Sequence, residues 1–367
     1  MDEDGTPGRR GGAGGVSPPS RSGVAIVGGG LAGLALADEL ERAGIDWHLF
    51  EARGRWGGRM HSLNADGAAF DLGPSWFWSI QPRMQALAKR LGCDVFEQYS
   101  HGDLLYEDNK ATVHRERGFA SMAGSLRVDG GMQSLTDALA AGLPASRLHP
   151  ATPVTGVDRQ RGLLLADGRQ WPAGHIVLAI PPRTAANLAF EPELAPEQIR
   201  ALARVPTWMA GHAKFVAVFG TPFWRDHGLS GDAMSHAGPL VEIHDASPGS
   251  GLPGALFGFY GVPAEIRRDN PGRLAEATMA QLERLFGAEA RDPRHTRVQD
   301  WAFEPETATP DDRSPPAGHP EYGPLTALEA AWGGCLLLGG SETAGAFGGY
   351  MEGALERSAE LAGHIIG

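Results

Sequence analysis

The chain has 367 residues, which is enough for two domains, and its hydrophobic content of 42% is typical of a globular protein. Its formal net charge of −12 argues against nucleic acid or an anionic membrane surface as a partner. The sequence holds two cysteines, Cys93 and Cys335, so it indicates neither a disulfide framework nor a cysteine-bound metal and is compatible with a reducing cytoplasm.

The first 22 residues are rich in Gly, Ser, Pro and Arg, and we expect them to form a disordered tail. Arg9 and Arg10 suggest a twin-arginine export signal, but no apolar segment follows them before the first expected strand, so we expect no such signal. No apolar run in the sequence reaches membrane-spanning length. These features predict a cytoplasmic protein without a membrane partner.

A glycine-rich turn follows the first expected strand, residues 23–28, and precedes an Ala- and Leu-rich segment with a helical pattern. Gly28 allows a tight turn, Gly30 lets the backbone approach a pyrophosphate, and Gly33 lets the helix pack closely on the strand. The helix N-terminus then offers free N–H groups to phosphate oxygens. An ordinary glycine turn is the alternative for this motif taken alone.

Glu51 ends a second apolar run, 18 residues after the last glycine of the turn, where the acidic partner of a ribose hydroxyl is expected. Gly57 and Gly58 follow, with Arg53 and Arg59 on either side of them. A nicotinamide site does not need this second cluster, whereas a buried flavin pyrophosphate does, because arginine binds phosphate in a bidentate manner. A solvated basic loop is the alternative.

The remaining pattern alternates helices and strands at first and later contains a hairpin around the turn Asp167-Gly168. Helical periodicity and alternating apolar residues define these elements. In chain order we predict a helix over 31–43, a strand over 46–51, a helix over 81–91, short polar strands or loops over 101–118, a helix over 134–141, strands over 154–157, 162–165, 175–182 and 214–219, a helix over 271–286, a strand over 336–342 and a helix over 351–366.

With these motifs the sequence resembles the flavin-containing amine oxidase superfamily, which includes monoamine, polyamine and L-amino acid oxidases. Further segments similar to family motifs cover most of residues 23–367: the strand 176–182, the Phe-Trp-Arg segment 223–225, and the C-terminal segments 338–344 and 349–354. The resemblance implies an α/β fold in which a Rossmann-like FAD-binding domain is interleaved with an α+β substrate domain of mixed sheet and helices.

The same resemblance implies a discontinuous FAD-binding domain, assembled from residues 23–80, 128–185 and 325–367. The segments between them, residues 81–127 and 186–324, are then expected to form the substrate domain.

The resemblance also implies FAD as the cofactor and assigns contacts to it. Glu342 is expected at the ribityl or pyrophosphate region, and Val154 is a further expected contact. The amide of Met351 is expected at the pyrimidine edge of the flavin, where the positive end of the last helix stabilises negative charge. A helix-capping acid without a ligand is the alternative for Glu342. Monoamine oxidases attach their flavin to a cysteine, and the matching stretch 308–316 has none, so we expect non-covalent FAD.

The implied chemistry is transfer of a hydride equivalent from the carbon beside an amine nitrogen to flavin N5. Tyr350 matches one of the two aromatic rings that flank the amine in monoamine oxidases, and the other position falls near Pro310, so half of this aromatic cage is expected. Trp301 resembles a tryptophan that lies beside the flavin in the family. Core packing is the alternative for both aromatic residues.

A lysine that holds a water near flavin N5 is common in the family, and we place Ala264 at its position. Lys214 lies on an earlier strand, where the family often has a lysine too, and it is kept as a catalytic candidate. The expected loss of the N5 lysine leaves both O2 and another electron acceptor open.

A third departure from the family is length, because residues 92–130 are too few to hold the helical insertion that caps the substrate cavity. We therefore expect a more open site that accepts a bulky or carrier-bound amine as well as a small one. His61 and the aromatic run Trp76, Phe77 and Trp78 are expected near the loop that returns to the flavin, as substrate wall or as core.

The sequence thus predicts an FAD-dependent oxidoreductase that oxidises a C–N bond of an amine to an imine, either as an oxidase or as a dehydrogenase. Two alternatives stay open: a flavin-dependent desaturase or isomerase that acts on C–C bonds, and a weakly catalytic flavin-binding partner protein.

Overall fold

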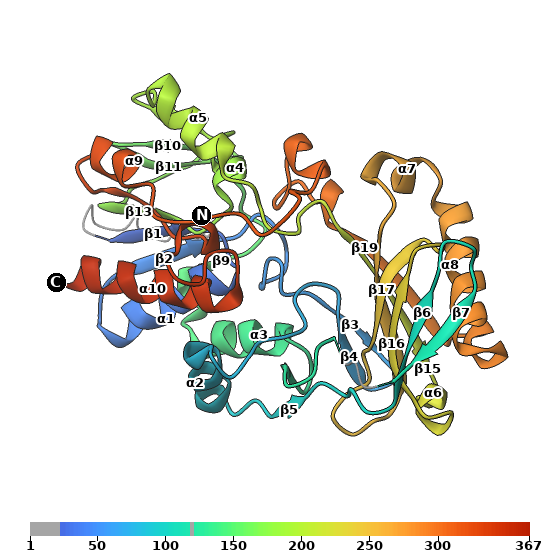
Figure 1. Cartoon of the computed structure of the whole chain (residues 1–367). Coiled ribbons are helices and arrows are strands. Elements are labelled where there is room, and N and C mark those ends of the chain that lie inside the picture. The colour runs from blue at the N-terminus through green and yellow to red at the C-terminus, as the bar shows by residue number, and fades with distance from the viewer. Residues whose placement is uncertain (1–22, 118–120) are drawn as a thin grey trace, which may run out of the picture.

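A five-stranded parallel sheet forms one half of the molecule in a computed structural model, which describes residues 23–117 and 121–367. The predicted tail, residues 1–22, lies outside the described residues. The sheet order is β20 (Leu336–Leu338), β13 (His175–Leu178), β1 (Val24–Val27), β2 (Trp47–Phe50) and β9 (Leu148–His149). The strands come from distant parts of the chain, as the interleaved α/β fold requires (Figure 1).

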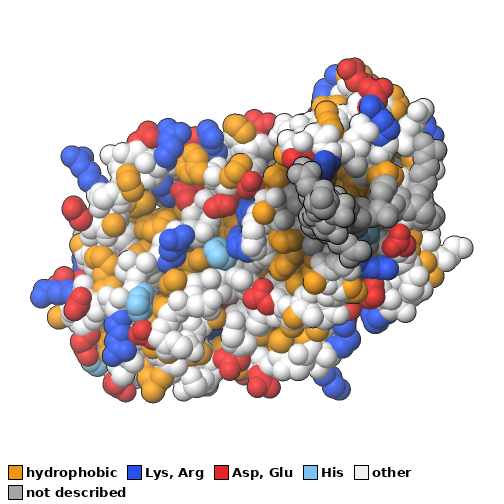
Figure 2. Space-filling model, turned by 180° about the vertical axis from the view of Figure 1, so that it is seen from behind, with side chains coloured by type: hydrophobic (Ala, Val, Ile, Leu, Met, Phe, Trp, Pro, Cys, Tyr) orange, Lys and Arg blue, Asp and Glu red, His pale blue; other side chains and the backbone are white. Residues whose placement is uncertain are grey.

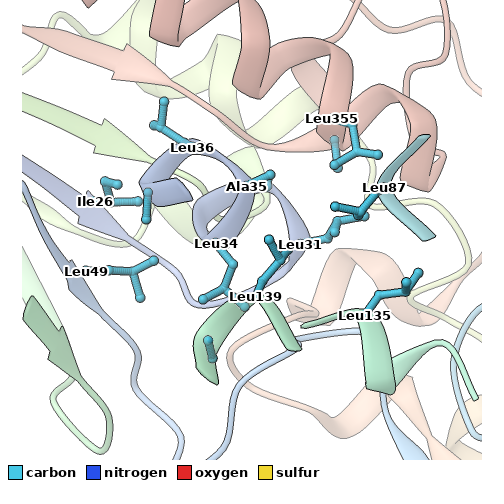
Figure 3. Close-up of a cluster of buried hydrophobic side chains, with 14 of the residues drawn as sticks. Ile26, Leu31, Leu34, Ala35, Leu36, Leu49, Leu87, Leu135, Leu139 and Leu355 are labelled. Atoms are coloured by element: carbon cyan, nitrogen blue, oxygen red, sulfur yellow. The ribbon is translucent and has the colours of Figure 1, made fainter. Parts of the chain in front are cut away.

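Helix α1 (Leu31–Arg42) lies between this sheet and helix α10 (Met351–Ile366). Eight of its 12 residues are buried, because the sheet, α10 and helix α3 (Gln133–Gly142) cover most of its circumference. Figure 3 shows Ile26 and Leu49 of the sheet on one side of α1 and Leu355 of α10 on the other. This packing fixes the N-terminus of α1 relative to the strands.

A seven-stranded, mostly antiparallel sheet forms the other half of the molecule, with α8 (Pro271–Phe286) packed against it (Figure 1). The strand predicted over 214–219 is present as β15 (Ala213–Phe219), but the exposed face that its alternating pattern suggests is absent: all seven residues are buried because both faces of the sheet are covered. The sheet order is β19 (His295–Asp300), β15 (Ala213–Phe219), β18 (Gly254–Tyr260), β17 (Leu240–Asp245), β16 (Leu229–Ser235), β6 (Asp103–Glu107) and β7 (Val113–Glu116).

The remaining strands form three smaller sheets. A four-stranded sheet contains β12 (Gln170–Trp171), β11 (Gly162–Leu165), β10 (Val154–Asp158) and β14 (Ala189–Glu191). Two ribbons pair β3 (Ser62–Ala65) with β4 (Ala68–Asp71) and β5 (Val95–Glu97) with β8 (Leu126–Val128). The remaining α-helices are α2 (Pro82–Leu91), α4 (Pro182–Ala185), α5 (Pro196–Arg204), α6 (Phe223–Asp226), α7 (Ala264–Asp269) and α9 (Thr326–Ala331).

The Rossmann-like half and the mixed-sheet half confirm the predicted fold class, whereas the exact domain division stays a prediction. Helix α2 was assigned to the substrate domain, but its apolar face packs against α10 and α3 in the core of the parallel sheet. Strand β14 pairs with β10 rather than with the seven-stranded sheet. Both elements therefore pack with the predicted cofactor half.

The described part of 92–130 holds four short strands and no helix, as its length predicts. Within the described ranges, no helix has the length and apolar character needed to cross a membrane. Figure 2 shows acidic and basic side chains interspersed over one face of the molecule, without a basic field that would attract a polyanion there.

Two histidines are packed together at the edge of the parallel sheet. His48 Nδ1 and His149 Nε2 lie 2.9 Å apart, and the His149 ring stacks on Phe50 at 4.6 Å between ring centroids. Burial, with the neighbouring His48, lowers the pKa of His149 to about 4, and burial also lowers the pKa of His48. Both rings are therefore neutral in the folded protein at pH 7.

These lowered pKa values predict acid sensitivity. The unfolded chain binds more protons than the folded one between the ordinary histidine pKa of about 6.5 and the folded value of about 4. Stability is therefore fully present above pH 6.5 and falls as the pH drops towards 4, by about 1 kcal/mol for the half-buried His149 after solvent screening.

The check is urea unfolding of the wild type and of H149F at pH 7.5, 6.0 and 5.0. H149F keeps an aromatic ring on Phe50 but does not titrate, so we expect a shallower loss of stability between pH 6.5 and 5. H101N changes an exposed histidine and serves as the control. An equally steep acid loss in H149F would contradict this account.

Candidate functional site

A cavity of about 450 Å³ lies where the two halves of the molecule meet. The glycine turn, the Arg/Gly cluster and the start of α10 line it from the parallel-sheet half. Strands β15, β17 and β18 line it from the seven-stranded sheet. Its walls are mostly apolar with a few polar groups, the usual character of a small-molecule site.

The glycine turn forms one end of this cavity. Gly28 has φ +109°, and a Cβ there would lie 2.6 Å from the Ala179 carbonyl oxygen. A Cβ at Gly33 would lie 2.0 Å from the Gly28 carbonyl oxygen, so the third glycine permits the packing of helix on strand. At Gly30, by contrast, a Cβ would meet no atom closer than 3.9 Å, and this residue lines the cavity. The free space in front of Gly30 fits a ligand that approaches the backbone.

Glu51 ties this turn to the next segment of the chain. Its carboxylate accepts hydrogen bonds from the Gly29 amide at 2.7 Å and from the Arg53 amide at 2.8 Å, and it lines the cavity. An acidic side chain fixed in this way is suited to accept a hydroxyl hydrogen bond from a ribose. Arg53 also lines the cavity, and its guanidinium donates to Glu304 and to the Thr307 hydroxyl.

The second glycine cluster faces the first across a short gap. The Gly57 amide donates to the Gly29 carbonyl at 2.8 Å, and a Cβ on Gly58 would lie 3.3 Å from the Gly30 Cα. Gly57, Gly58 and Arg59 all line the cavity. Two side-chain-free turns and an arginine thus surround the space in front of the N-terminus of α1.

Glu342 lies buried next to Arg59. Its buried carboxylate binds the Arg59 guanidinium, with Nη1 to Oε1 at 2.5 Å and Nη2 to Oε2 at 3.1 Å, and it also accepts from the Ser341 hydroxyl. Ser341 lines the cavity, whereas Glu342 is not among the lining residues. Glu342 therefore holds Arg59 in position from behind, and a direct contact between Glu342 and a cofactor stays a prediction.

Helix α10 points its first turn at the cavity. Met351 begins the helix, and both it and the capping residue Tyr350 line the cavity. The free amides of this 16-residue helix therefore stabilise negative charge at that point. Val154 is not brought to the cavity wall, although Thr152, two residues before it, donates its amide to the Glu51 carbonyl.

These residues fit the dinucleotide FAD. The space in front of Gly30 would take a pyrophosphate, Arg53 and Arg59 would supply positive charge, and Glu51 would accept a hydrogen bond from a ribose hydroxyl. Each of these contacts stays a prediction. The positive end of α10 faces the cavity, where it would stabilise negative charge on a bound flavin ring. Within the described ranges, no cluster of acidic, histidine or cysteine side chains is arranged to hold a metal ion.

Aromatic side chains line the end of the cavity beside α10. Tyr350 and Trp301 are among them, and the Trp301 indole donates to the Leu72 carbonyl at 3.0 Å, while their contacts with amine and flavin stay predictions. Pro310, where the second cage ring was expected, is not a lining residue. Trp208 lines the cavity instead and was missed, because it lies in a short segment before β15 with no repeating pattern.

A histidine connects the two aromatic walls. The ring of His319 stacks on Tyr350 at 4.9 Å between centroids and contacts Trp208 at 4.8 Å. Trp76 and Trp78 line the cavity further along, while Phe77 is buried in the core of the parallel-sheet half. His61 lies off the cavity, with its Nδ1 3.2 Å from the Gln133 side-chain oxygen.

Lys214 is buried at the cavity wall. Its ammonium donates to the Gly73 carbonyl at 3.0 Å and to the Ser75 hydroxyl at 2.6 Å, and it lies 3.9 Å from the centroid of the Phe257 ring. Burial lowers the pKa of Lys214 to about 7, against the attraction of the carboxylate of Asp71. The side chain therefore exchanges a proton near neutral pH.

The expectation that Ala264 marks the position of a missing cavity lysine is wrong. Ala264 is buried at the start of helix α7 and does not line the cavity, whereas Lys214 does. The order of segments along the chain suggested the later strand, but β15 and β18 are adjacent, so the earlier strand also reaches the cavity. The chain therefore has a lysine at this site.

Glu242 is a second functional candidate that the sequence interpretation missed. Its carboxylate lines the cavity on β17, and its Oε1 lies 2.8 Å from His244 Nε2. The hydrogen bond from His244 lowers the pKa of Glu242, so this carboxylate is ionised at neutral pH. Glu242 and His244 are two residues apart on one strand, so the sequence predicts that they share a face of the sheet. It does not show that this face meets the cavity, and it is therefore only weak evidence for a functional role.

Comparison with known proteins identifies what this arrangement resembles. Residues 102–366 match the family model described as flavin containing amine oxidoreductase, and residues 26–91 match an NAD(P)-binding Rossmann-like domain. The chain is 27% identical to AofH of Mycobacterium tuberculosis, a protein named as a flavin-containing monoamine oxidase, over 95% of this chain and 98% of the relative. That alignment spans 458 positions, so the relative carries inserted residues.

Two further relatives cover most of the chain. The putrescine oxidase of Kocuria rosea is 24% identical over 74% of this chain and 80% of its own length. The solved structure of cyclohexylamine oxidase from Brevibacterium oxydans IH-35A superimposes with a TM-score of 0.79 at 19% identity, and covers 94% of this chain and 98% of that one. The structural likeness extends over both halves of the molecule.

The glycine geometry predicts opposite effects for two alanine substitutions. G30A places a methyl group in open space, so the protein should fold normally while its FAD affinity falls at least tenfold. G33A forces a methyl group against the Gly28 carbonyl and should destabilise the fold by about 2 kcal/mol or more.

The measurements are FAD binding by fluorescence quenching and thermal unfolding of the cofactor-free protein. G272A, at an exposed residue of α8 with open space around the Cβ and no positive φ, is the control for both. Wild-type FAD affinity in a folded G30A protein would show that the pyrophosphate does not approach Gly30.

Proposed function

Because this chain belongs to the flavin-containing amine oxidoreductase family, we propose that it oxidises the C–N bond of a small primary diamine to an imine at the cavity between its two halves. The protein is an FAD-dependent oxidoreductase. When bound, FAD supplies the two-electron acceptor for the hydrogen on the carbon beside nitrogen. The observation that carries the proposal is the buried Lys214 in the same cavity as the dinucleotide turn.

Lys214 is suited to proton exchange in this reaction. As a neutral amine it keeps two N–H donors, which match the two acceptors Gly73 O and Ser75 Oγ, and its lone pair is free to take a proton. Its pKa of about 7 makes both forms accessible at neutral pH. The apolar ring of Phe257 on one side limits water around the ammonium.

Tyr350 and Trp208 are proposed to flank the amine nitrogen beside the reacting carbon of the substrate. Both rings line the cavity and both contact His319, so one histidine fixes the two walls relative to each other. Aromatic faces attract an ammonium group and tolerate the neutral amine that oxidation requires.

Glu242 supports a diamine as the substrate class. Lys214 pairs with Phe259 on the neighbouring strand, and Phe259 pairs with Glu242 on the next, so these three cavity residues form one row across the sheet. Two strand spacings separate the ends of the row by about 10 Å. A carboxylate at that distance from the catalytic end is placed to bind the second ammonium of a short diamine, and one of the relatives is named putrescine oxidase.

Three further aspects belong to the same proposal. FAD is bound without a covalent link, because neither Cys93 nor Cys335, both described by the structure, lines the cavity. O2 is the proposed electron acceptor, and the free cysteines favour a reducing compartment such as the cytoplasm. Because the same cavity must also hold the flavin, its volume of about 450 Å³ favours a small amine over a carrier-bound one.

Replacement of Lys214 tests the catalytic half of the proposal. K214M should lower amine turnover with O2 at least tenfold, because the cavity loses its proton-exchanging group. Wild-type turnover should fall as the pH drops below about 7, where the ammonium form of Lys214 accumulates. The variant should not show this decrease. K89M, at an exposed lysine of α2, is the control, and K214M with an unchanged rate and pH profile would exclude the role.

Replacement of Glu242 tests the substrate class. E242Q keeps the size and a hydrogen-bonding group but removes the charge, so kcat/KM for 1,4-diaminobutane should fall about 10- to 100-fold, as for loss of a charged hydrogen bond. Butylamine, which lacks the second ammonium, should change less than threefold. The matched control is E276Q, on the exposed face of α8. Equal losses for the diamine and the monoamine would refute the assignment.

A further inference from the structure

We propose that His244 and Asp232 are positioning residues that hold the Glu242 carboxylate in one orientation and keep it ionised, and thereby set the preference for a diamine over a monoamine. This inference rests on the proposed function, because it concerns the recognition of the second ammonium group. It adds residues that do not touch the reacting atoms.

The three side chains form a hydrogen-bonded chain that leads away from the cavity. Glu242 Oε1 lies 2.8 Å from His244 Nε2, and His244 Nδ1 lies 2.9 Å from Asp232 Oδ1. Both ring nitrogens are therefore engaged by carboxylates, which requires each nitrogen to carry a proton in order to donate. Only the first member of the chain, Glu242, lines the cavity.

Packing prevents the imidazole from taking another orientation. The side chain of His244 is fully buried and that of Asp232 is 2% exposed, whereas that of Glu242 is 30% exposed. The edge of Trp76 contacts the His244 ring at 4.9 Å between centroids, and Phe257 contacts it at 5.3 Å. The Trp76 indole is itself fixed by a hydrogen bond to Gln98. The hydrogen bonds among the three side chains thus hold the Glu242 carboxylate in a fixed position at the cavity wall.

The net charge of Glu242, His244 and Asp232 together matches one ammonium group. Burial alone would lower the pKa of His244, but the hydrogen bonds to Asp232 and Glu242 and the charges of both outweigh it, so the pKa of His244 is raised. An imidazolium between two carboxylates leaves one net negative charge. A single substrate ammonium beside Glu242 would neutralise it.

The surroundings add few other ionisable groups. From the elements packed against β17, the groups that face His244 are Asp232 on β16, the hydroxyl of Ser121 at 3.4 Å, and the non-ionising rings of Trp76 and Phe257. Lys214 lies beyond Phe257 on β15. On β17 itself, Asp245 is engaged by Trp224 and Arg225 instead.

The test compares kcat/KM for 1,4-diaminobutane and butylamine in the FAD-loaded wild type and in H244N between pH 5.5 and 7.5. Both substrates are fully protonated over this range, so the ratio of the two values isolates recognition of the second ammonium from catalysis. We expect a constant ratio in the wild type, because the pKa of Glu242 is lowered. In H244N the Glu242 carboxylate loses its cationic partner, so the ratio should fall about tenfold and fall further towards pH 5.5.

A matched variant and a double variant complete the design. H227N, at an exposed histidine paired with Glu289, should leave the ratio unchanged. In an E242Q background, H244N should cause no further fall in the ratio, because the group that His244 positions has lost its charge. An equal loss for both substrates in H244N, with a normal ratio, would mean a purely structural role and would overturn the inference.

Failure of the inference is distinguishable from failure of the proposed function. A wild type without any preference for the diamine contradicts the proposed role of Glu242 and, with it, this inference. A wild type with the preference but an H244N ratio equal to its own contradicts the inference alone. If H244N does not fold, the wild-type profile decides: a ratio that drops between pH 7.5 and 6 overturns the inference, and a constant ratio supports it.

Discussion

The close approach of two glycine turns is the constraint on which the cofactor half depends. A Cβ on Gly58 would lie 3.3 Å from the Gly30 Cα, so the two turns approach closely at this point, and the Glu51 carboxylate fixes the first turn through the Gly29 amide. The buried helix α1 then has its N-terminus at the edge of the cavity. Arg59 reaches the same space because Glu342 binds it from behind. The shape of the predicted dinucleotide site therefore depends on the backbone geometry of the two turns, and Arg59 adds positive charge to it.

The seven-stranded sheet supplies the other half of the chemistry by a different principle. Adjacent strands place residues from distant segments in one row, so that Lys214, Phe259 and Glu242 share the cavity wall. A proton-exchanging amine lies at one end of this row and a carboxylate at the other. In the proposed function, reaction and substrate recognition are thereby separated along one face of the sheet, while the aromatic residues Tyr350 and Trp208 belong to loops.

Much of the cofactor half was predictable from the sequence, because its signals are local. The glycine spacing, the acid after β2 and the Arg/Gly cluster are short motifs, and all of their named residues except Gly33 do meet at one cavity. The role of each in binding FAD remains a prediction. The substrate half was less predictable, since Lys214 and Glu242 reach the cavity only through strand pairings between distant segments. The order of segments along the chain predicts that Ala264 takes the position of the cavity lysine. This prediction is wrong because β15 pairs with β18, so that Lys214 on the earlier strand reaches the cavity, whereas Ala264 begins α7.

The central claim is that a buried FAD in this cavity accepts electrons from an amine. The most direct measurement is anaerobic mixing of the FAD-loaded protein with 1,4-diaminobutane, followed by the visible absorbance of the flavin and then by admission of air. The account predicts that the absorbance bleaches without oxygen and returns in air together with hydrogen peroxide. Bound FAD whose spectrum stays unchanged with this diamine and with a panel of other amines would contradict it.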